Sequence, residues 1–150
     1  MKHIVLVGNM KVGKKGDSIV TYALGTSLGL IAYDPVAKVG GLLHAMLPLS
    51  KTDPKKAEAN PCIFVDTGVP QLFNAVCDLG ADKARLLLKA AGCSRPEGDN
   101  EMFKIGEKNY SVLKKILWKN NMLLESEDIG GTANRTIQFD LTTGEMKITN

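Results

Sequence analysis

The sequence predicts a single domain of the α/β or α+β class, built on mixed β-sheets. Short runs of apolar and β-branched residues outnumber the helical patterns, and the two clear helical patterns fall between such runs. The chain has 150 residues, enough for one hydrophobic core, and no repeat or linker divides it. We therefore expect one domain over residues 1–150.

Residues 4–46 are predicted to form strands. Glycine and Asp-Pro turn signals separate four apolar runs. The last run has no polar alternation, which predicts a strand buried on both faces. The predicted strands are residues 4–7, 18–24, 28–33 and 39–46.

A loop and a helix are predicted next. Residues 49–61 are polar and hold two prolines, which predicts an exposed loop with room for one helical turn after Asp53. Residues 66–79 carry apolar side chains at helical spacing. Pro70 is placed in the first turn, where a missing N–H breaks no hydrogen bond, and Gly80 ends the helix.

The second half is predicted to combine strands with one more helix. The clearest helical pattern covers residues 107–120, with apolar residues on one face and lysines opposite. A loop containing Pro96 and Gly98 is predicted before it, over residues 92–101. The predicted strands are residues 84–91, 122–126, 136–141 and 145–149, of which the last two form a hairpin.

Composition excludes several classes of protein. Hydrophobic residues make up 44% and charged residues 23%, which is typical of a globular domain and not of a disordered chain. The net charge of +3 and the scattered lysines predict no nucleic-acid partner. The N-terminal apolar run is too short for a signal peptide, and no stretch approaches the roughly 18 apolar residues that span a bilayer. We therefore expect a cytoplasmic protein without membrane insertion.

One segment nearly matches a phosphate-binding loop. Residues 8–15 read GNMKVGKK, but Lys15 stands where the motif needs a hydroxyl for magnesium. The motif also needs a helix directly after it, and a β-branched run follows instead. We interpret the match as chance and the segment as a solvated basic turn.

The cysteines and the N-terminal histidine are given no catalytic role. Cys62, Cys77 and Cys93 lack the spacing of metal ligands, so they predict reduced, mostly buried thiols, with no metal and no cofactor. Cys93 is interpreted as a structural thiol and not as a displaced nucleophile. His3 is expected at the edge of the first strand.

Residues 17–48 hold the candidate site. The turn Leu24-Gly25-Thr26-Ser27 places small hydroxyl side chains between two predicted strands, an arrangement that can expose a nucleophile and align backbone N–H groups as an oxyanion hole. His44 lies in an otherwise apolar run, where an imidazole needs a polar partner or a catalytic role. From these residues alone the simpler interpretation is the stronger one, with Ser27 as a turn residue and His44 as a hydrogen-bonded strand residue.

The same segment resembles the CheD family of chemoreceptor glutamine deamidases. In that family a threonine strand leads to Leu-Gly-[Ser/Thr]-Cys, an Asp-Pro turn follows, and then a Gly-x-x-His-x-Met-Leu-Pro strand. The resemblance covers nearly the whole chain in order, and it implies a fold of mixed sheets packed together and flanked by helices. The matching residues are Thr21, the turn at 24–27, Asp34-Pro35, the run 41–48, Asp66, the run 105–109, the run 127–131, Arg135 and Thr143-Gly144.

The resemblance also implies an activity. A cysteine of the family attacks the carboxamide of a glutamine in a methyl-accepting chemotaxis receptor, and hydrolysis of the thioester leaves glutamate after ammonia has departed. Carried over by position, His44 is the general base, Thr21 orients it, and Ser27 occupies the place of the nucleophile. Thr26 and Ser27 would form the turn and part of the oxyanion hole.

Ser27 departs from the family's pattern. A thiol ionises near pH 8.5, and lower beside an imidazolium, whereas a hydroxyl needs a general base that is usually held by a carboxylate. Thr21 offers only a neutral hydroxyl for that role. We therefore expect this chain to be inactive or feeble, either because its cysteine was replaced deliberately, which we favour since the rest of the pattern is intact, or because it is a degenerate relative.

Two other functions stay open. CheD relatives also bind the CheC phosphatase, so the chain could be a non-catalytic chemotaxis adaptor that binds receptors or a CheC-type phosphatase. A serine amidase that uses Ser27 and His44 directly is disfavoured because no carboxylate partner is implied. For a deamidase acting on a helical receptor we expect a shallow cleft with Ser27 and His44 at its base, and not a wide apolar pocket.

Overall fold

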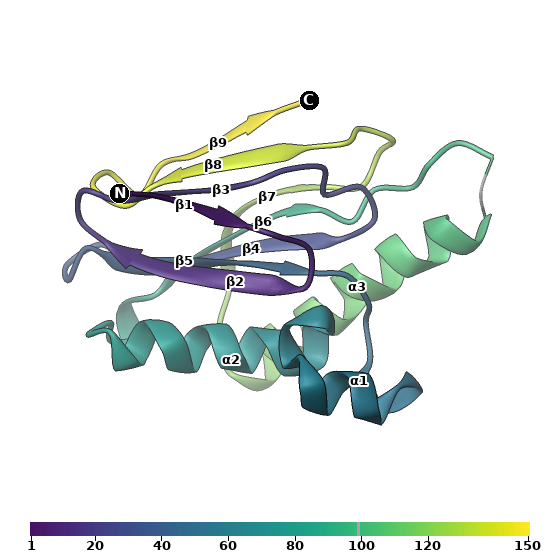
Figure 1. The fold of residues 1–150 in the computed structure, drawn as a ribbon, viewed down its shortest axis with the longest axis horizontal. Helices are drawn as coiled ribbons and strands as arrows, with labels where there is room; N and C mark the ends of the chain where they lie inside the picture. Colours follow the sequence, from purple (N-terminus) through teal and green to yellow (C-terminus); the bar gives the residue numbers. More distant parts are fainter. Residues whose placement is uncertain (99) are drawn as a thin grey trace.

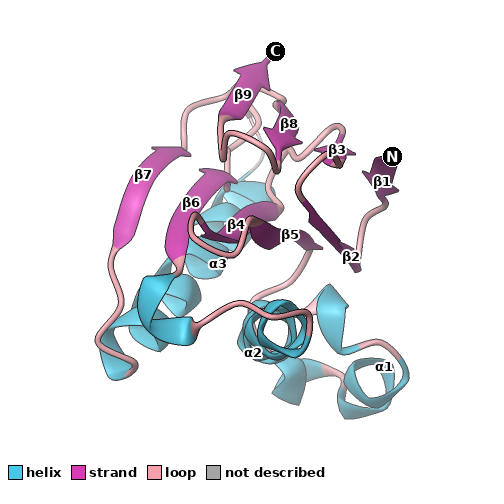
Figure 2. Ribbon diagram, turned by 90° about the vertical axis from the view of Figure 1, so that its left-hand side faces the viewer, coloured by secondary structure: helices cyan, strands magenta, loops and turns pink. Residues whose placement is uncertain are grey.

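In the computed structural model, which describes residues 1–98 and 100–150, nine strands form two mixed β-sheets that pack face to face (Figures 1 and 2). One sheet, here sheet A, has the strand order β1–β3–β8–β9, and the other, sheet B, has the order β2–β5–β4–β6–β7. Only β1 with β3 and β6 with β7 run parallel among the described pairs. The strands are β1 (Lys2–Val5), β2 (Asn9–Lys14), β3 (Ser18–Thr21), β4 (Leu28–Asp34), β5 (Val39–Ala45), β6 (Leu87–Gly92), β7 (Leu124–Ile129), β8 (Thr136–Asp140) and β9 (Met146–Thr149).

The helices lie on the face of sheet B that is turned away from sheet A (Figure 1). Two long helices, α2 (Val65–Asp78) and α3 (Asn100–Lys119), cover this face, and the short α1 (Pro54–Ala59) lies at the margin of the layer (Figure 2). Three short 3-10 turns accompany them, η1 (Ser50–Thr52), η2 (Pro61–Ile63) and η3 (Lys83–Arg85). The predicted class, mixed sheets packed together and flanked by helices, is confirmed.

Sheet B lies between two hydrophobic cores, and its central strands contribute to both. Every residue of β4 and β5 is buried, as predicted for the run at 39–46. Because side chains alternate along a strand, Leu30 and Leu43 pack toward the helices while Ile31 and Leu42 pack toward sheet A. The face toward sheet A is the one that receives the candidate site.

The basic segment near the N-terminus was predicted wrongly as a turn. Residues Asn9–Lys14 form β2, an edge strand of sheet B paired with β5. The alternation of Met10 and Val12 with polar residues puts both apolar side chains, partly buried, against the core under the helices. The exposed Lys11 on the other face is typical of an edge strand. The prediction of a turn was based on the glycines and lysines of the motif and overlooked this alternation of apolar and polar residues, which is typical of a strand.

Several helix and strand limits also differ from the prediction. Pro70 lies inside α2, in its second turn and not its first, because α2 begins at Val65. Residues 84 and 85 belong to η3 and residue 86 follows it, so β6 begins at Leu87 and not at residue 84. The long helix α3 begins at Asn100, so the predicted loop at 92–101 is shorter, and its residue 99 lies outside the described residues. The segment at 49–61 is exposed but mostly helical.

Candidate functional site

His44 lies between the two sheets, near the end of β5. It pairs with Gly29 of β4 on one side and with Asn9 of β2 on the other. The side chain is only 1% exposed, so its imidazole is removed from water. A Cβ on Gly29 would lie 2.6 Å from the terminal methyl of Ile137, so any larger residue beside His44 would displace the Ile137 side chain.

Thr21 fixes the orientation and the tautomer of His44. The Thr21 hydroxyl, at the end of β3 in sheet A, donates to the carbonyl of Val5 at 2.8 Å. It also lies 2.8 Å from His44 Nδ1. A hydroxyl has a single proton, so Thr21 must accept from His44 here, and the ring proton is on Nδ1. His44 Nε2 therefore holds a lone pair.

Burial keeps the imidazole neutral. Loss of hydration lowers the pKa of His44 from the ordinary 6.5 to about 4. Within the described residues Nε2 is buried and has no hydrogen-bond partner. A neutral imidazole with a fixed tautomer and an unused lone pair is suited to take a proton from a neighbouring group.

Ser27 ends a tight turn that leads into β4. The turn is closed by a hydrogen bond from Ser27 N–H to Leu24 C=O at 2.8 Å, and Gly25 supplies a positive φ of +51° at its first central position. Ser27 is 7% exposed, and its hydroxyl makes no hydrogen bond to any described residue. The turn therefore presents the side chain at residue 27 without tying it down.

Ser27 and His44 share one face of sheet B. Gly29 is the partner of His44, and residue 27 lies two positions earlier, so alternation directs its side chain to the same face. Diagonal neighbours of this kind have Cα atoms about 7–8 Å apart and side chains that can reach each other. The Thr21–His44 contact thus lies at the seam between the sheets, and alternation puts residue 27 on the same side of sheet B.

Two residues that the sequence did not single out as site residues hold the turn. Asn109 of α3 is fully buried, and its Nδ2 donates to the carbonyls of Thr26 at 3.0 Å and Met46 at 3.1 Å. Ser94, after β6, donates to the Gly25 carbonyl from both its N–H at 3.0 Å and its hydroxyl at 2.7 Å. Both contacts join residues far apart in the chain, so no local pattern could predict them.

The backbone of β6 is shaped to approach the turn closely. The Cys93 N–H donates to the Ser27 carbonyl at 2.8 Å. A Cβ on Gly92 would collide with that same carbonyl oxygen, and Gly92 has a φ of +101°. Cys93 itself has a φ of +51°, which is uncommon outside glycine. These conformations indicate a backbone held in place by the contact with residue 27.

The remaining thiols and His3 lie apart from this chemistry. Burial raises the pKa of the Cys93 thiol to about 12, which favours the structural role expected for it. Cys62 is also buried, Cys77 is partly buried, and all three cysteines are free. His3 lies within β1, which is an edge strand of sheet A, and its Nε2 lies 3.4 Å from Asp17 Oδ2.

Exposed apolar side chains flank the site. The turn after β1 carries Leu6 and Val7, which are 66% and 54% exposed, and the N–H of Gly8 that ends the turn donates to the His44 carbonyl. Tyr22 directly follows Thr21, and Met46 lies two residues after His44, and both are exposed. A surface of this kind could contact the apolar side of a protein substrate.

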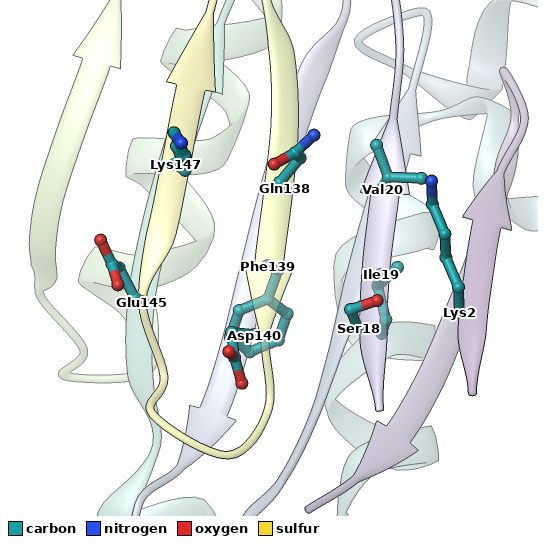
Figure 3. A pocket seen from close by; sticks show the side chains of 9 residues that line it. All are labelled: Lys2, Ser18, Ile19, Val20, Gln138, Phe139, Asp140, Glu145 and Lys147. Atoms are coloured by element: carbon teal, nitrogen blue, oxygen red, sulfur yellow. The ribbon is translucent and has the colours of Figure 1, made fainter. Parts of the chain in front are cut away.

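A separate hollow lies on the outer face of sheet A (Figure 3). It has a volume of about 480 Å³ and includes neither Ser27 nor His44 in its lining. The lysines and carboxylates in Figure 3 are solvent-exposed, so this hollow lacks the buried charged groups that are typical of a reactive site. The lining residues are Lys2, Ser18, Ile19, Val20, Gln138, Phe139, Asp140, Glu145 and Lys147.

Comparison with known proteins identifies the family. The model of the family described as CheD chemotactic sensory transduction matches residues 46–150. The chain belongs to the CheD family. A relative from Syntrophus aciditrophicus, named probable chemoreceptor glutamine deamidase CheD 1, is 44% identical over 144 residues, which cover 95% of this chain and 90% of the relative. One from Pyrococcus horikoshii, named probable chemoreceptor glutamine deamidase CheD, is 43% identical over 151 residues, which cover 99% of this chain and 92% of the relative.

The resemblance predicted from the sequence is thus confirmed at the level of the family. The family model begins at residue 46, after the three candidate residues, but the CheD relative from Pyrococcus horikoshii spans them because it covers 99% of the chain. Among the described residues, no helix combines the length and apolar character needed to cross a membrane.

Proposed function

We propose that this chain is a cytoplasmic CheD-type protein-glutamine deamidase of methyl-accepting chemotaxis receptors, and that Ser27 in the nucleophile's place leaves it inactive or feeble. One observation supports this more than any other. His44 Nε2 is buried, unprotonated and without a partner in the described structure, on the same sheet face as the side chain of residue 27. The names of the CheD relatives support the substrate class.

With a cysteine at residue 27, the reaction follows from the roles assigned to the three residues. His44 Nε2 takes the thiol proton as sulfur attacks the carboxamide carbon of a receptor glutamine. The imidazolium then gives that proton to the departing nitrogen, which leaves as ammonia, and a thioester remains. Water then loses a proton to His44 and attacks the thioester. Glutamate is released, and the thiol is restored.

A hydroxyl at residue 27 is a poor substitute in this environment. His44, with a pKa of about 4, is a weak base, and the proton of a hydroxyl is far harder to remove than that of a thiol. The imidazolium formed during attack would face only the neutral Thr21 hydroxyl, whereas serine hydrolases place a carboxylate there. Loss of the carboxylate's role in such a triad lowers kcat about 10⁴-fold, so feeble activity is the most that we expect.

The test compares the chain with its Ser27→Cys variant on a receptor cytoplasmic fragment. Mass spectrometry reports glutamine converted to glutamate, residue by residue. We expect conversion by Ser27→Cys, little or none by the chain as it is, and none by Ser27→Ala or by Ser27→Cys combined with His44→Asn. If Ser27→Cys does not convert any glutamine, the deamidase proposal is wrong for this chain.

Ser27 also supports a second candidate, the adaptor that binds receptors or a CheC-type phosphatase. The Ser27 hydroxyl makes no hydrogen bond to described residues, so the fold around it does not depend on which side chain stands there. A binding role would therefore be the same with serine, cysteine or alanine at this position. Equal affinity of the three forms for a CheC-type phosphatase, together with no deamidation by Ser27→Cys, would make the adaptor the function of the chain.

A further inference from the structure

We propose that Ser94 is a positioning residue that directs the backbone N–H of Thr26 toward the oxyanion formed during deamidation. The proposal rests on the proposed deamidase function, in which Thr26 is expected to contribute to the oxyanion hole, and it adds the group that aligns the Thr26 N–H. It assigns a role to a buried residue that no motif of the sequence indicates. Ser94 is 2% exposed and lies just beyond the end of β6.

The Gly25–Thr26 peptide is held from its carbonyl side. Ser94 donates to the Gly25 carbonyl twice, from its N–H at 3.0 Å and from its hydroxyl at 2.7 Å. A trans peptide is planar, and its C=O and N–H point in opposite directions. When Ser94 fixes the Gly25 carbonyl, it therefore also fixes the direction of the Thr26 N–H.

The strand order gives that direction. β4 lies between β6 and β5, and Ser94 follows β6. The Gly25 carbonyl thus faces the β6 side of the turn, and the Thr26 N–H is directed toward the β5 side, where His44 lies. The unused donor is thus directed away from Ser94, beside the position of the nucleophile.

Thr26 offers the available donor in the turn. Its N–H makes no hydrogen bond within residues 1–98 and 100–150, although Thr26 is only 8% exposed. The neighbouring Ser27 N–H is already donated to Leu24 at 2.8 Å, and the Gly25 N–H to Asn134 Oδ1 at 3.0 Å. An unused, nearly buried backbone donor beside the nucleophile position is the element that an oxyanion hole needs.

The next peptide is held as well. Asn109 donates to the Thr26 carbonyl at 3.0 Å, so the peptide units on both sides of Thr26 have fixed planes. A donor that is aligned before the reaction costs no reorganisation when negative charge develops on the oxygen. The short, largely buried turn is in this way connected to both β6 and α3.

The direct test removes the Thr26 N–H. With cysteine at residue 27, the chain can be assembled by native chemical ligation of a synthetic segment 1–26 to a recombinant segment 27–150. The Gly25–Thr26 amide is replaced by an ester in the synthetic segment. The matched control places an ester at Ala23, whose N–H also makes no hydrogen bond to described residues and lies in the same loop. The all-amide Ser27→Cys protein made in the same way is the reference.

We expect the ester at Thr26 to lower kcat for glutamine deamidation by about 10²- to 10³-fold with little change in KM, and the ester at Ala23 to change neither. The rate at which iodoacetamide alkylates the thiol introduced at residue 27 should be equal in all three proteins, because that reaction needs the thiol and His44 but forms no oxyanion. Unchanged kcat in the ester at Thr26 would overturn the proposal.

A second pair of variants tests Ser94 without synthesis. In the Ser27→Cys chain, Ser94→Ala removes the hydroxyl donor and keeps the N–H donor, so we expect kcat to fall on the order of tenfold at constant KM. Ser94→Thr restores the hydroxyl and should recover most of that loss. If Ser94→Ala deamidates at the full rate, Ser94 is not a positioning residue. If the Ser27→Cys parent itself is inactive, the failure lies in the deamidase proposal, and the oxyanion role falls with it.

Discussion

Acid should destabilise this protein through His44, and the size of the effect follows from its burial. His44 is 1% exposed, and its pKa falls from 6.5 to about 4 on folding. Above pH 6.5 the imidazole is neutral in the folded and the unfolded chain, so it contributes no pH dependence. Between pH 6.5 and 4 the unfolded chain binds a proton that the folded chain does not, and the free energy of unfolding therefore decreases as pH falls through this window.

The magnitude can be worked out from the two pKa values. At about 1.4 kcal/mol per pH unit, the window from 6.5 to about 4 amounts to about 3 kcal/mol. At pH 4.5 most of that loss, about 2.5 kcal/mol, has already occurred. The effect must be isolated by a variant that lacks only the His44 imidazole.

His44→Asn is that variant, because its amide can donate to Thr21 in place of Nδ1–H and does not titrate. Urea denaturation at pH 7.5 and 4.5 measures the free energy of unfolding of both proteins. We expect the parent to lose about 2.5 kcal/mol more than His44→Asn between these two values. The His44 ring resonance should also not move between pH 7.5 and 5.5. An equal loss in both proteins, or a ring that titrates near pH 6.5, would refute the inference that burial keeps His44 neutral.

Three further substitutions test the contacts around the site. Thr21→Val keeps the shape but leaves two buried groups unpaired, so urea denaturation should show a loss of about 2–4 kcal/mol, and the variant should lower kcat in the active cysteine form. Gly92→Ala should lower the free energy of unfolding by about 2–4 kcal/mol because its Cβ would collide with the Ser27 carbonyl oxygen. The control Gly98→Ala also has a positive φ but open space around the Cβ, so it should lower the free energy of unfolding by only about 1 kcal/mol. Equal losses in the two variants would contradict the contact between Gly92 and Ser27. Asn109→Leu should lower the thermal midpoint and the stability by about 2–4 kcal/mol, and a neutral result would show that its two carbonyl partners find other donors.

The sequence predicted the strands whose apolar runs are bounded by turns, and it failed where two signals competed. The run at 39–46 was predicted correctly as a doubly buried strand because no polar residue other than His44 interrupts it. The segment Asn9–Lys14 was missed because glycine and lysine indicate a loop, while pairing with β5 along an edge makes it a strand. Pro70 was placed in a first turn, but packing of α2 on sheet B begins the helix at Val65 and accommodates the proline inside it.

The site was predictable only in its local part. Ser27 in a glycine turn and His44 in an apolar run could be read from neighbouring residues, and their roles came from the resemblance to the CheD family. Asn109 and Ser94 act across 83 and 69 residues of chain, respectively. Sequence patterns describe residues that are close together in the chain. Contacts between such distant residues are therefore seen only when the folded structure is known.

The bond between Thr21 and His44 joins the two sheets, since Thr21 ends β3 in sheet A and His44 belongs to β5 in sheet B. Its length therefore depends on the spacing between the sheets, which is set by large buried side chains such as Ile19 and Phe139. A substitution that thickens or thins this layer would shift the imidazole or free its tautomer without touching the site. For that reason, substitutions in the core between the sheets should reduce activity before they prevent folding.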